Sequence, residues 1–451
     1  MSFDIDILPK EFVLMQKQLL GEDGFNDYLK SLENKSEKGL RINTNKMSSE
    51  TFLSLYDEKP LEKIPYFENC YYSNKEKLGS NILHQIGCFY SQEPASMLPV
   101  SLLKRFDLQG KRVLDLCASP GGKSLQVATL VEENGLVVSN EIIPSRAKIL
   151  QSNIERMGVK NFIVLNDNPK NIASNLKNVF DVVIVDAPCS GEGLFRKDFD
   201  YVRQWSKEGV TKNAERQKEI LTMADKCLKP NGLLLYSTCT YARQENEDNV
   251  EFLESLGYSV LDVDDQIKNV AKVSMIKENT VRCFPCYTRG EGQFCALLKK
   301  CDGDFVEKSN QKINYVKNKL VENFIADNLN IDFDYHLEMV GNFYCLTPSS
   351  NIDTKNLKVV LKGVMLGEIV KNRFVPHHQM FSSLGNYFKL KLDLKDDEIM
   401  IKKYLKGEQL SYDLPNGYGV IMYNGASVGG FKSTDGQLKN LYPKGLRIDL
   451  K

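Results

Sequence analysis

The sequence has no long hydrophobic run. Its longest apolar stretches, such as residues 182–185 and 233–236, are far shorter than the roughly 20 residues that a helix needs to cross a bilayer. Residues 1–12 include two aspartates and lack the basic start and apolar core of a secretory signal. We therefore expect a cytoplasmic protein with no membrane partner.

An excess of either charge is also missing. Lys and Arg together number 59, and Asp and Glu together also number 59. The composition thus gives no argument for a nucleic-acid partner, and any basic surface must come from local clustering. Residues 416–451 show such clustering, because five Lys or Arg stand there against two Asp, which leaves +3.

The cysteines do not describe a disulfide framework. Their number is odd, eleven, and their spacing is irregular, which favours free thiols in a reducing compartment. Cys283 and Cys286 form a C-x-x-C pair, but the chain has no second pair and a structural zinc site needs four ligands. We predict no metal site. His377 and His378 lack a third ligand nearby and are expected to pack.

Between about residues 80 and 300, short apolar runs alternate with helix-length segments. This alternation predicts βαβ units and a mostly parallel sheet. After residue 300 the sequence turns polar, as in a linker. Asn424-Gly425 between two apolar runs predicts a β-hairpin, because both turn positions need φ > 0. Strands are expected at residues 112–116, 136–140, 161–165, 181–185, 232–237, 258–263 and 294–298, and a helix at 145–157.

The densest motif is VLDLCASPGGK, residues 113–123. Asp115 stands near the end of an apolar strand, and a loop with proline and two glycines leads to a helix expected from about Ser124. Such a loop lets the backbone approach a ligand, and the helix start offers free N–H groups. It is not a Walker A loop, because Cys117 stands where the first glycine is required, and G-x-G-x-x-G is absent. Alone, it fits a plain strand–turn–helix corner equally well.

Polar residues follow the next three strands at the point where each ends. Glu141 follows the second strand, Asn166-Asp167 the third, and Asp186 ends the fourth. In open α/β sheets ligands bind outside the carboxyl ends of the strands, and an acid after the second strand typically binds ribose hydroxyls. The joint spacing favours a nucleotide-type site over four unrelated loop residues.

Two cysteines lie just past neighbouring strand ends. Cys189 belongs to DAPCSGEG, residues 186–193, and Cys239 to YSTCTY, residues 236–241. A free cysteine is commonly a small buried hydrophobe. Two at strand tips beside a ligand loop instead favour thiol chemistry.

These motifs together resemble the RsmB/RsmF (NSUN-type) family of RNA cytosine-C5 methyltransferases, and most closely its bacterial 16S rRNA members of the RsmF kind. The likeness runs in order over roughly residues 30–300 and includes Gln92-Glu93-Pro94 and Arg282…Gly290-Glu291-Gly292. The tail, residues 440–447, resembles the PUA-like RNA-binding end of that subfamily.

The resemblance implies an α/β fold of the class I SAM-dependent methyltransferase type, which is Rossmann-like with a seven-stranded, mostly parallel sheet. It also implies a division into an N-terminal RNA-binding extension (1–80), a methyltransferase domain (81–302), a linker with an intermediate C-terminal domain (303–380), and a PUA-like RNA-binding region of α+β or β structure (381–451). The implied partner is ribosomal RNA or the small ribosomal subunit, bound by a monomer, with no DNA.

The resemblance also implies roles for single residues. Glu141 binds the ribose of S-adenosylmethionine (SAM), Asp167 lies near its adenine, and Asp186 lies between cofactor and target base. Cys239 is the nucleophile and Cys189 acts in product release, while Lys123 supplies positive charge near the thiol. The remaining cofactor contacts come from Cys117, Ala118, Ser119, Pro120, Gly121, Gly122, Lys123 and Arg146.

Other functions are weighed against this one. In a DNA cytosine-C5 methyltransferase the cysteine of the Pro-Cys motif, here Cys189, is the nucleophile, but the Thr-Cys motif and the tail argue against that class. An amino-group methyltransferase would carry (N/D)-P-P-(Y/F/W) where this chain has Asp-Ala-Pro-Cys. A silent SAM-binding assembly factor would not need both cysteines.

Two further expectations concern exposed segments. Arg196-Lys197-Asp198 could contact phosphate, but a solvated turn is the simpler expectation. A chain cut near residue 305 is expected to bind SAM almost normally while losing RNA affinity and its salt dependence, because the basic tail lies beyond a polar linker.

Overall fold

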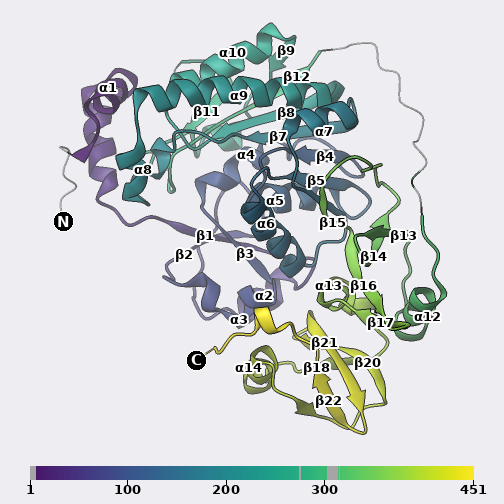
Figure 1. Cartoon of the computed structure of the whole chain (residues 1–451). Coiled ribbons are helices and arrows are strands. Elements are labelled where there is room, and N and C mark those ends of the chain that lie inside the picture. Colours follow the sequence, from purple (N-terminus) through teal and green to yellow (C-terminus); the bar gives the residue numbers. More distant parts are fainter. Residues whose placement is uncertain (1–6, 274–275, 302–312, 314, 451) are drawn as a thin grey trace.

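The computed structural model describes residues 7–273, 276–301, 313 and 315–450. Its centre is a ten-stranded sheet whose middle five strands are parallel neighbours (Figure 1). In spatial order these are β8 (Leu228–Thr238), β7 (Phe180–Asp186), β4 (Arg112–Asp115), β5 (Leu136–Asn140) and β6 (Phe162–Leu165).

Antiparallel strands extend both edges of this parallel centre. Beyond β8 lie β12 (Gln293–Lys300), β11 (Thr280–Cys283) and β10 (Lys272–Val273), and β9 (Tyr258–Val260) pairs with β12. Beyond β6 lies β15 (Val359–Lys362). The seven strands expected from the sequence are all present. The expected number of strands is too low, because β10, β11 and β15 also belong to the sheet and bring it to ten. Only the middle five strands are parallel, so the sheet is mostly parallel at its centre alone.

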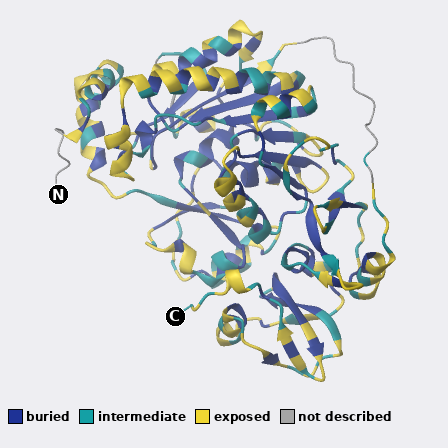
Figure 2. Cartoon of the chain, in the orientation of Figure 1, coloured by how far each residue is buried: buried dark blue, intermediate teal, exposed yellow. Residues whose placement is uncertain are grey.

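Helices cover both faces of the sheet. On one face, α5 (Gly122–Val131) and α6 (Pro144–Met157) share a core with alternate side chains of the central strands. On the other, α7 (Pro169–Asn175), α9 (Lys207–Cys227) and α10 (Glu247–Ser255) share a second core. Because both faces are covered, the central strands are buried along their length (Figure 2).

The N-terminal part begins with α1 (Lys10–Leu32) and a small sheet of β1 (Lys38–Ile42), β2 (Cys70–Ser73) and β3 (Phe89–Gln92). Phe12 of α1 packs against Phe195 and Trp205, with ring centroids 4.8 and 5.8 Å away. This contact attaches α1 to the region around α8 (Phe199–Gln204). The shorter helices are α2 (Ser49–Leu55), α3 (Ile82–Gln85), α4 (Leu98–Ser101) and α11 (Asp265–Lys268).

Two further sheets follow the ten-stranded sheet along the chain. The first contains β13 (Tyr335–Val340), β14 (Phe343–Pro348), β16 (Val364–Val370) and β17 (Arg373–Pro376), with α12 (Lys319–Asn328) and α13 (His378–Leu384). The second contains β18 (Lys391–Asp393), β19 (Leu410–Ser411), β20 (Gly417–Tyr423), β21 (Ala426–Thr434) and β22 (Gln437–Asn440), with α14 (Glu398–Lys406).

The last sheet packs against the N-terminal one, and both contribute to one hydrophobic core that joins Leu40 and Phe89 to Ile401 and Phe431. The predicted hairpin is confirmed between β20 and β21, where Asn424 has φ 48° and its neighbour glycine φ 81°. The linker expected after residue 300 falls mainly on residues 302–312, outside the described residues. Within the described ranges, no helix combines the length and hydrophobicity that a membrane crossing demands.

Candidate active site

The loop after β4 is held in place from several sides. Gly121 adopts φ 111°, where an L side chain is strained, and α5 begins at Gly122, two residues before the expected position. The Ser119 hydroxyl donates to the carbonyl of Arg146, and the Arg146 guanidinium donates back to the carbonyl of Ser119, both at 3.0 Å. The buried Arg41 guanidinium donates to the carbonyls of Gly122 and Leu125 at 3.2 Å. The loop is therefore rigid before any ligand arrives.

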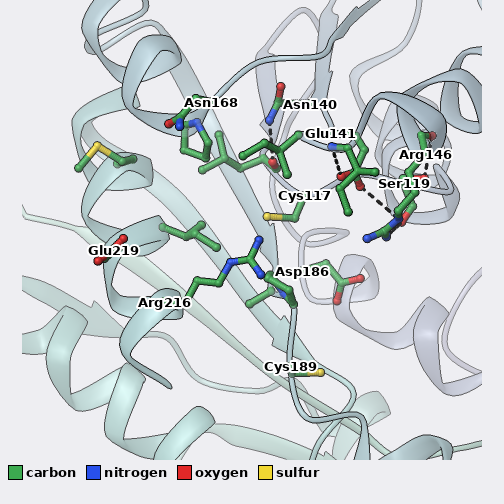
Figure 3. Close-up of a pocket in the computed structure, with 18 of the residues that line it drawn as sticks. Cys117, Ser119, Asn140, Glu141, Arg146, Asn168, Asp186, Cys189, Arg216 and Glu219 are labelled. Atoms are coloured by element: carbon green, nitrogen blue, oxygen red, sulfur yellow. Dashed lines mark hydrogen bonds and ion pairs between the residues drawn. The ribbon is translucent and has the colours of Figure 1, made fainter. Parts of the chain in front are cut away.

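The loop forms one wall of a cavity of about 470 Å³, here called the first cavity (Figure 3). Its size lies in the range of small-ligand sites. Glu141 is 4% exposed, accepts the N–H of Ile143 at 2.9 Å, and lies 3.5 Å from Arg146. The apolar part of the lining comes from Leu116, Ile142, Ile143, Pro188, Ile220 and Met223.

Six predicted cofactor residues do not line the first cavity: Ala118, Pro120, Gly122 and Lys123 line a neighbouring cavity instead, and Asp167 and Gly121 line neither. Asp167 is 5% exposed, and its carboxylate accepts hydrogen bonds from the N–H groups of Asn168 and Lys358 and from the Asn171 amide. The residue of this turn that faces the cavity is its neighbour Asn168. Gly121 is likewise absent from the lining and serves the turn of the loop.

A second cavity of about 290 Å³ opens beside the first. Cys117, Ser119, Asp186 and Cys239 line both cavities. The rest of its wall comes from β3 and the residues just after it, from the end of β4 and the β4–α5 loop, from the segment between β7 and α8, and from the start of β12. These residues include Tyr90, Gln92, Glu93, Asp115, Ala118, Pro120, Gly122, Lys123, Leu194, Lys197 and Gly292.

The two predicted cysteines meet where the cavities join. β7 and β8 are parallel neighbours with Asp186 opposite Ser237, so the residues that follow them emerge side by side. The Sγ atoms of Cys189 and Cys239 are 3.1 Å apart. The Cys239 N–H donates to the Cys189 Sγ at 3.3 Å, and the Cys239 carbonyl accepts the Gly193 N–H at 2.9 Å.

Two of the thiols that line the first cavity, Cys189 and Cys117, have a raised pKa. The hydrogen bond with Cys239 and burial raise the pKa of Cys189 well above its usual value. Burial, with nearby carboxylates, also raises the pKa of Cys117 well above its usual range. Both residues therefore hold their protons at neutral pH, and Cys189 is placed to donate its S–H toward Cys239.

Lys123 and Asp186 form an ion pair beside the cysteines. The Lys123 Nζ lies 2.8 Å from the Asp186 Oδ2, and the Ser237 hydroxyl donates to the other carboxylate oxygen at 2.7 Å. Burial lowers the pKa of Lys123, but the Asp186 carboxylate more than offsets this and the net pKa is raised. Lys123 therefore stays positively charged. Burial also raises the pKa of Asp115, which lines the second cavity, to about 7.

Helices α8 and α9 supply lining residues that the sequence did not point to. Tyr201 is 38% exposed and covers Gly191, where an added Cβ would lie 2.6 Å from its ring. Arg216 extends from α9 toward the space beside Asp186 (Figure 3). No motif contains these two residues, and an exposed Tyr or Arg on a helix carries no signal of its own in one sequence.

The motifs Gln92-Glu93-Pro94 and Gly290-Glu291-Gly292 contact each other beside the second cavity. Glu93 accepts the N–H groups of Ala95, Ser96 and Glu291 at 2.8 to 3.0 Å. Arg196 is buried and forms an ion pair with Glu291 at 3.0 Å. The expected solvated turn at residues 196–198 is therefore wrong for Arg196, because its charge is matched by a buried carboxylate that lies far along the chain.

The residues considered for metal binding, Cys283, Cys286, His377 and His378, line neither of the two cavities. Burial raises the pKa of Cys283 to about 12. His378 is half-buried and packs against Tyr442, and desolvation lowers its pKa to about 3. In the portion of the chain that the structure describes, no three His, Cys, Asp or Glu side chains are grouped so that they could hold a metal ion.

Family models match four successive parts of the chain. They are the N-terminal domain of 16S rRNA methyltransferase RsmF (residues 8–94), 16S rRNA methyltransferase RsmB/F (104–299), the RsmF rRNA methyltransferase first C-terminal domain (323–384) and the methyltransferase RsmF PUA domain (389–448).

Known relatives match along nearly the whole length. The ribosomal RNA small subunit methyltransferase F of Vibrio vulnificus strain YJ016 is 31% identical over 465 residues, with 98% of each chain covered. The protein of the same name from Shewanella oneidensis is 30% identical over 471 residues. That alignment covers 99% of this chain and 98% of the Shewanella protein.

Among solved structures, NSun6 from Pyrococcus horikoshii with SFG superposes with a TM-score of 0.60 at 20% identity. It covers 66% of this chain and 100% of its own. That likeness shows the fold, which is the expected class I methyltransferase fold. The four matching models and the full-length relatives show the rest: the chain belongs to the RsmB/F family of 16S rRNA methyltransferases and is an enzyme of the RsmF kind.

Proposed function

We propose that this protein transfers a methyl group from SAM to C5 of a cytosine in 16S rRNA, with Cys239 as the covalent nucleophile. The observation that carries the proposal is the pair of sulfur atoms, 3.1 Å apart, where two cavities join. A methyl donor in the first cavity and a cytosine in the second would meet beside Cys239.

The residues of the first cavity fit SAM. The Glu141 carboxylate suits the ribose hydroxyls. The apolar wall, with Ile142 and Pro188, suits the adenine faces, and Asn168 offers an amide at the far side. Cys117 and Ser119 line both cavities, and the loop that contains them begins a helix at the boundary with the second cavity. The free N–H groups of this helix suit the methionine carboxylate. When bound, SAM supplies an electrophilic methyl group on a sulfonium.

The second cavity suits the target base. C5 of cytosine is a poor nucleophile until a thiolate adds to C6, forms an S–C6 bond and turns the ring into an enamine. C5 then takes the methyl group, a base removes the C5 proton, and the S–C6 bond breaks to restore the thiolate. The base must leave its stack to reach this depth, which favours single-stranded or flipped nucleotides.

The thiol surroundings favour Cys239 over Cys189 for the attack. Cys239 lines both cavities and Cys189 only the first, and the Cys189 Sγ, 3.1 Å away, can hydrogen-bond a Cys239 thiolate through its S–H. Lys123, charged and within electrostatic reach of Cys239, stabilises the same negative charge. Cys189 then lies where it can assist the elimination that releases product. Asp186, fixed by Lys123 and Ser237, lies between both cavities.

Ribosomal RNA contacts are assigned to the ends of the chain. The N-terminal extension and the PUA region would bind the RNA of the small subunit, in the cytoplasm and as a monomer. The model match at residues 389–448 and the +3 charge of residues 416–451 support this.

The experiment that tests the function is methyl transfer to defined nucleic acids. Purified protein with methyl-labelled SAM should label small-subunit rRNA, and mapping should place the label on C5 of cytosine. Cells that lack the gene should lose 5-methylcytosine at the same position. Label in duplex DNA, label on an amino group, or no transfer to any rRNA precursor would each contradict the proposal.

A second prediction concerns the ribose contact. Replacing Glu141 by alanine removes an acceptor for the ribose hydroxyls and should weaken SAM binding by about 1.5 to 3 kcal/mol. RNA affinity should not change. Calorimetry on Glu141→Ala measures this, and Glu133→Ala serves as a control because that glutamate lies outside both cavities. Equal SAM affinity in the two variants would remove Glu141 from the site.

A further inference from the structure

A strand from the C-terminal half of the chain is built into the methyltransferase sheet. β15 pairs antiparallel with β6, with Val359 opposite Leu165 and Lys362 opposite Ile163. The Gly363 N–H donates to the Phe162 carbonyl at 2.7 Å, and Leu361 is completely buried in the core of the sheet. β6 is therefore an inner strand, although it would be the edge of the sheet in the segment from 104 to 299 alone.

The segment just before β15 is hydrogen-bonded to the turn that follows β6. The Asn166 N–H donates to the Lys358 carbonyl at 2.9 Å, and the Lys358 N–H donates to the Asp167 carboxylate at 3.0 Å. The Asn171 amide donates to both the Asp167 carboxylate at 2.9 Å and the Asn356 carbonyl at 3.0 Å. The main chain of the C-terminal segment thus adds a hydrogen bond to a buried carboxylate that otherwise accepts from Asn168 and Asn171 within the methyltransferase segment.

That turn is in direct contact with the wall of the first cavity. The Asn166 amide donates to the carbonyls of Glu141 and Ile142, at 2.7 and 3.0 Å. The Asp167 carboxylate accepts the N–H of Asn168 at 2.7 Å. Glu141, Ile142 and Asn168 all line the first cavity.

The segment before β15 is itself held in place by an ion pair and by hydrogen bonds to its main chain. Lys362 and Glu338 form a buried ion pair at 2.7 Å, and the Lys362 ammonium also donates to the Ile352 carbonyl at 3.2 Å. Arg112, on β4, donates to the Ser350 carbonyl at 3.1 Å. The position of the segment is therefore fixed from both sides.

We propose that the first C-terminal domain completes the cofactor site, with the main chain of Asn356 and Lys358 holding the turn from Asn166 to Asn171 in the shape that receives the adenosine part of SAM. Asp167 is then a positioning residue that acts through Asn168. The proposal rests on the assignment of the first cavity to SAM.

One consequence reverses the expectation drawn from the sequence for a chain cut near residue 305. Such a chain lacks β15 and the segment before it, so β6 becomes an edge strand and the Asp167 carboxylate loses the Lys358 N–H. SAM binding should fall together with RNA binding.

The test uses the full chain with single proline substitutions in one loop. Lys358→Pro removes the N–H that Asp167 accepts. Lys355→Pro removes an N–H that bonds only to Asp353 within the loop, at a turn position that proline favours, because the next residue, Asn356, has φ 71°. Lys358→Pro should bind S-adenosylhomocysteine about tenfold more weakly or worse, whereas Lys355→Pro should bind like wild type.

The steady-state kinetics separate positioning from general damage. Lys358→Pro should raise the KM for SAM about tenfold and change kcat at saturating SAM by less than about twofold, with unchanged RNA affinity. Should Lys358→Pro not fold, Asn171→Asp, which places a like charge beside Asp167, should give the same KM effect. Ser174→Asp, which adds the same charge on an exposed site of α7, should not.

The outcomes are distinct from those of the proposed function. Wild-type protein that binds no S-adenosylhomocysteine would overturn the cofactor assignment itself. Wild type that binds it while folded Lys358→Pro, or Asn171→Asp in its place, binds equally well would overturn the positioning role of the C-terminal segment.

Discussion

Changing Cys239 to alanine is expected to lower methyl transfer by at least about 10³-fold. Without the thiolate no bond forms at C6, and C5 does not gain the electron density needed to take the methyl group. Cys189→Ala should look equally inactive in a multiple-turnover assay, because a blocked release step also stops the cycle. Initial rates with labelled SAM and small-subunit rRNA give this first measurement.

A single-turnover assay separates the two variants. Cys189→Ala retains Cys239 and should transfer close to one methyl group per enzyme, whereas Cys239→Ala should transfer none. Cys227→Ser is a suitable control, because Cys227 is buried in the sheet core and lies away from both cavities. Single-turnover transfer by Cys239→Ala and none by Cys189→Ala would exchange the assigned roles.

Replacing Lys123 by methionine is expected to lower kcat by about 10²-fold or more. Methionine keeps much of the side-chain volume but removes the charge that pairs with Asp186 at 2.8 Å. In the proposed mechanism the same charge stabilises a thiolate at Cys239. The substitution also leaves the Asp186 carboxylate, 35% exposed, without its partner. Affinity for S-adenosylhomocysteine should fall much less than kcat.

Lys123→Arg is the matched variant, because it keeps the charge while changing its shape. It should retain more activity than Lys123→Met. Equal kcat in wild type and Lys123→Met, measured at saturating SAM and RNA, would show that the ion pair only stabilises the fold. A thermal unfolding curve for each variant shows whether the loss comes from unfolding.

The parallel centre of the sheet was predictable because its physics is local. Five apolar runs separated by helix-length segments give five parallel strands, and the motif residues follow the strand ends wherever the strands lie. Glu141, Asp186, Cys189 and Cys239 therefore came together as the topology of any such sheet requires. The hairpin at Asn424 follows from the φ preferences of two residues.

The remaining features depend on contacts between distant segments. β15 joins β6 across nearly 200 residues, and its short run carries no sign of its partner. From the sequence alone, Arg196 is expected to be an exposed basic residue. The structure pairs it with Glu291, which lies far along the chain. Asp167 and Asn168 differ by one position, and only the contact with Lys358 shows which of them faces the cavity.

The most direct measurement is a denaturing gel of protein incubated with SAM and substrate rRNA. Cys189→Ala should run as a slow band that ribonuclease removes, because the enzyme attacks, methylates once and stays attached through Cys239. Wild type, Cys239→Ala and the Cys189→Ala/Cys239→Ala double variant should show no such band. A slow, ribonuclease-sensitive band in Cys239→Ala, lost when Cys189 is also replaced, would contradict the assignment of Cys239 as the nucleophile.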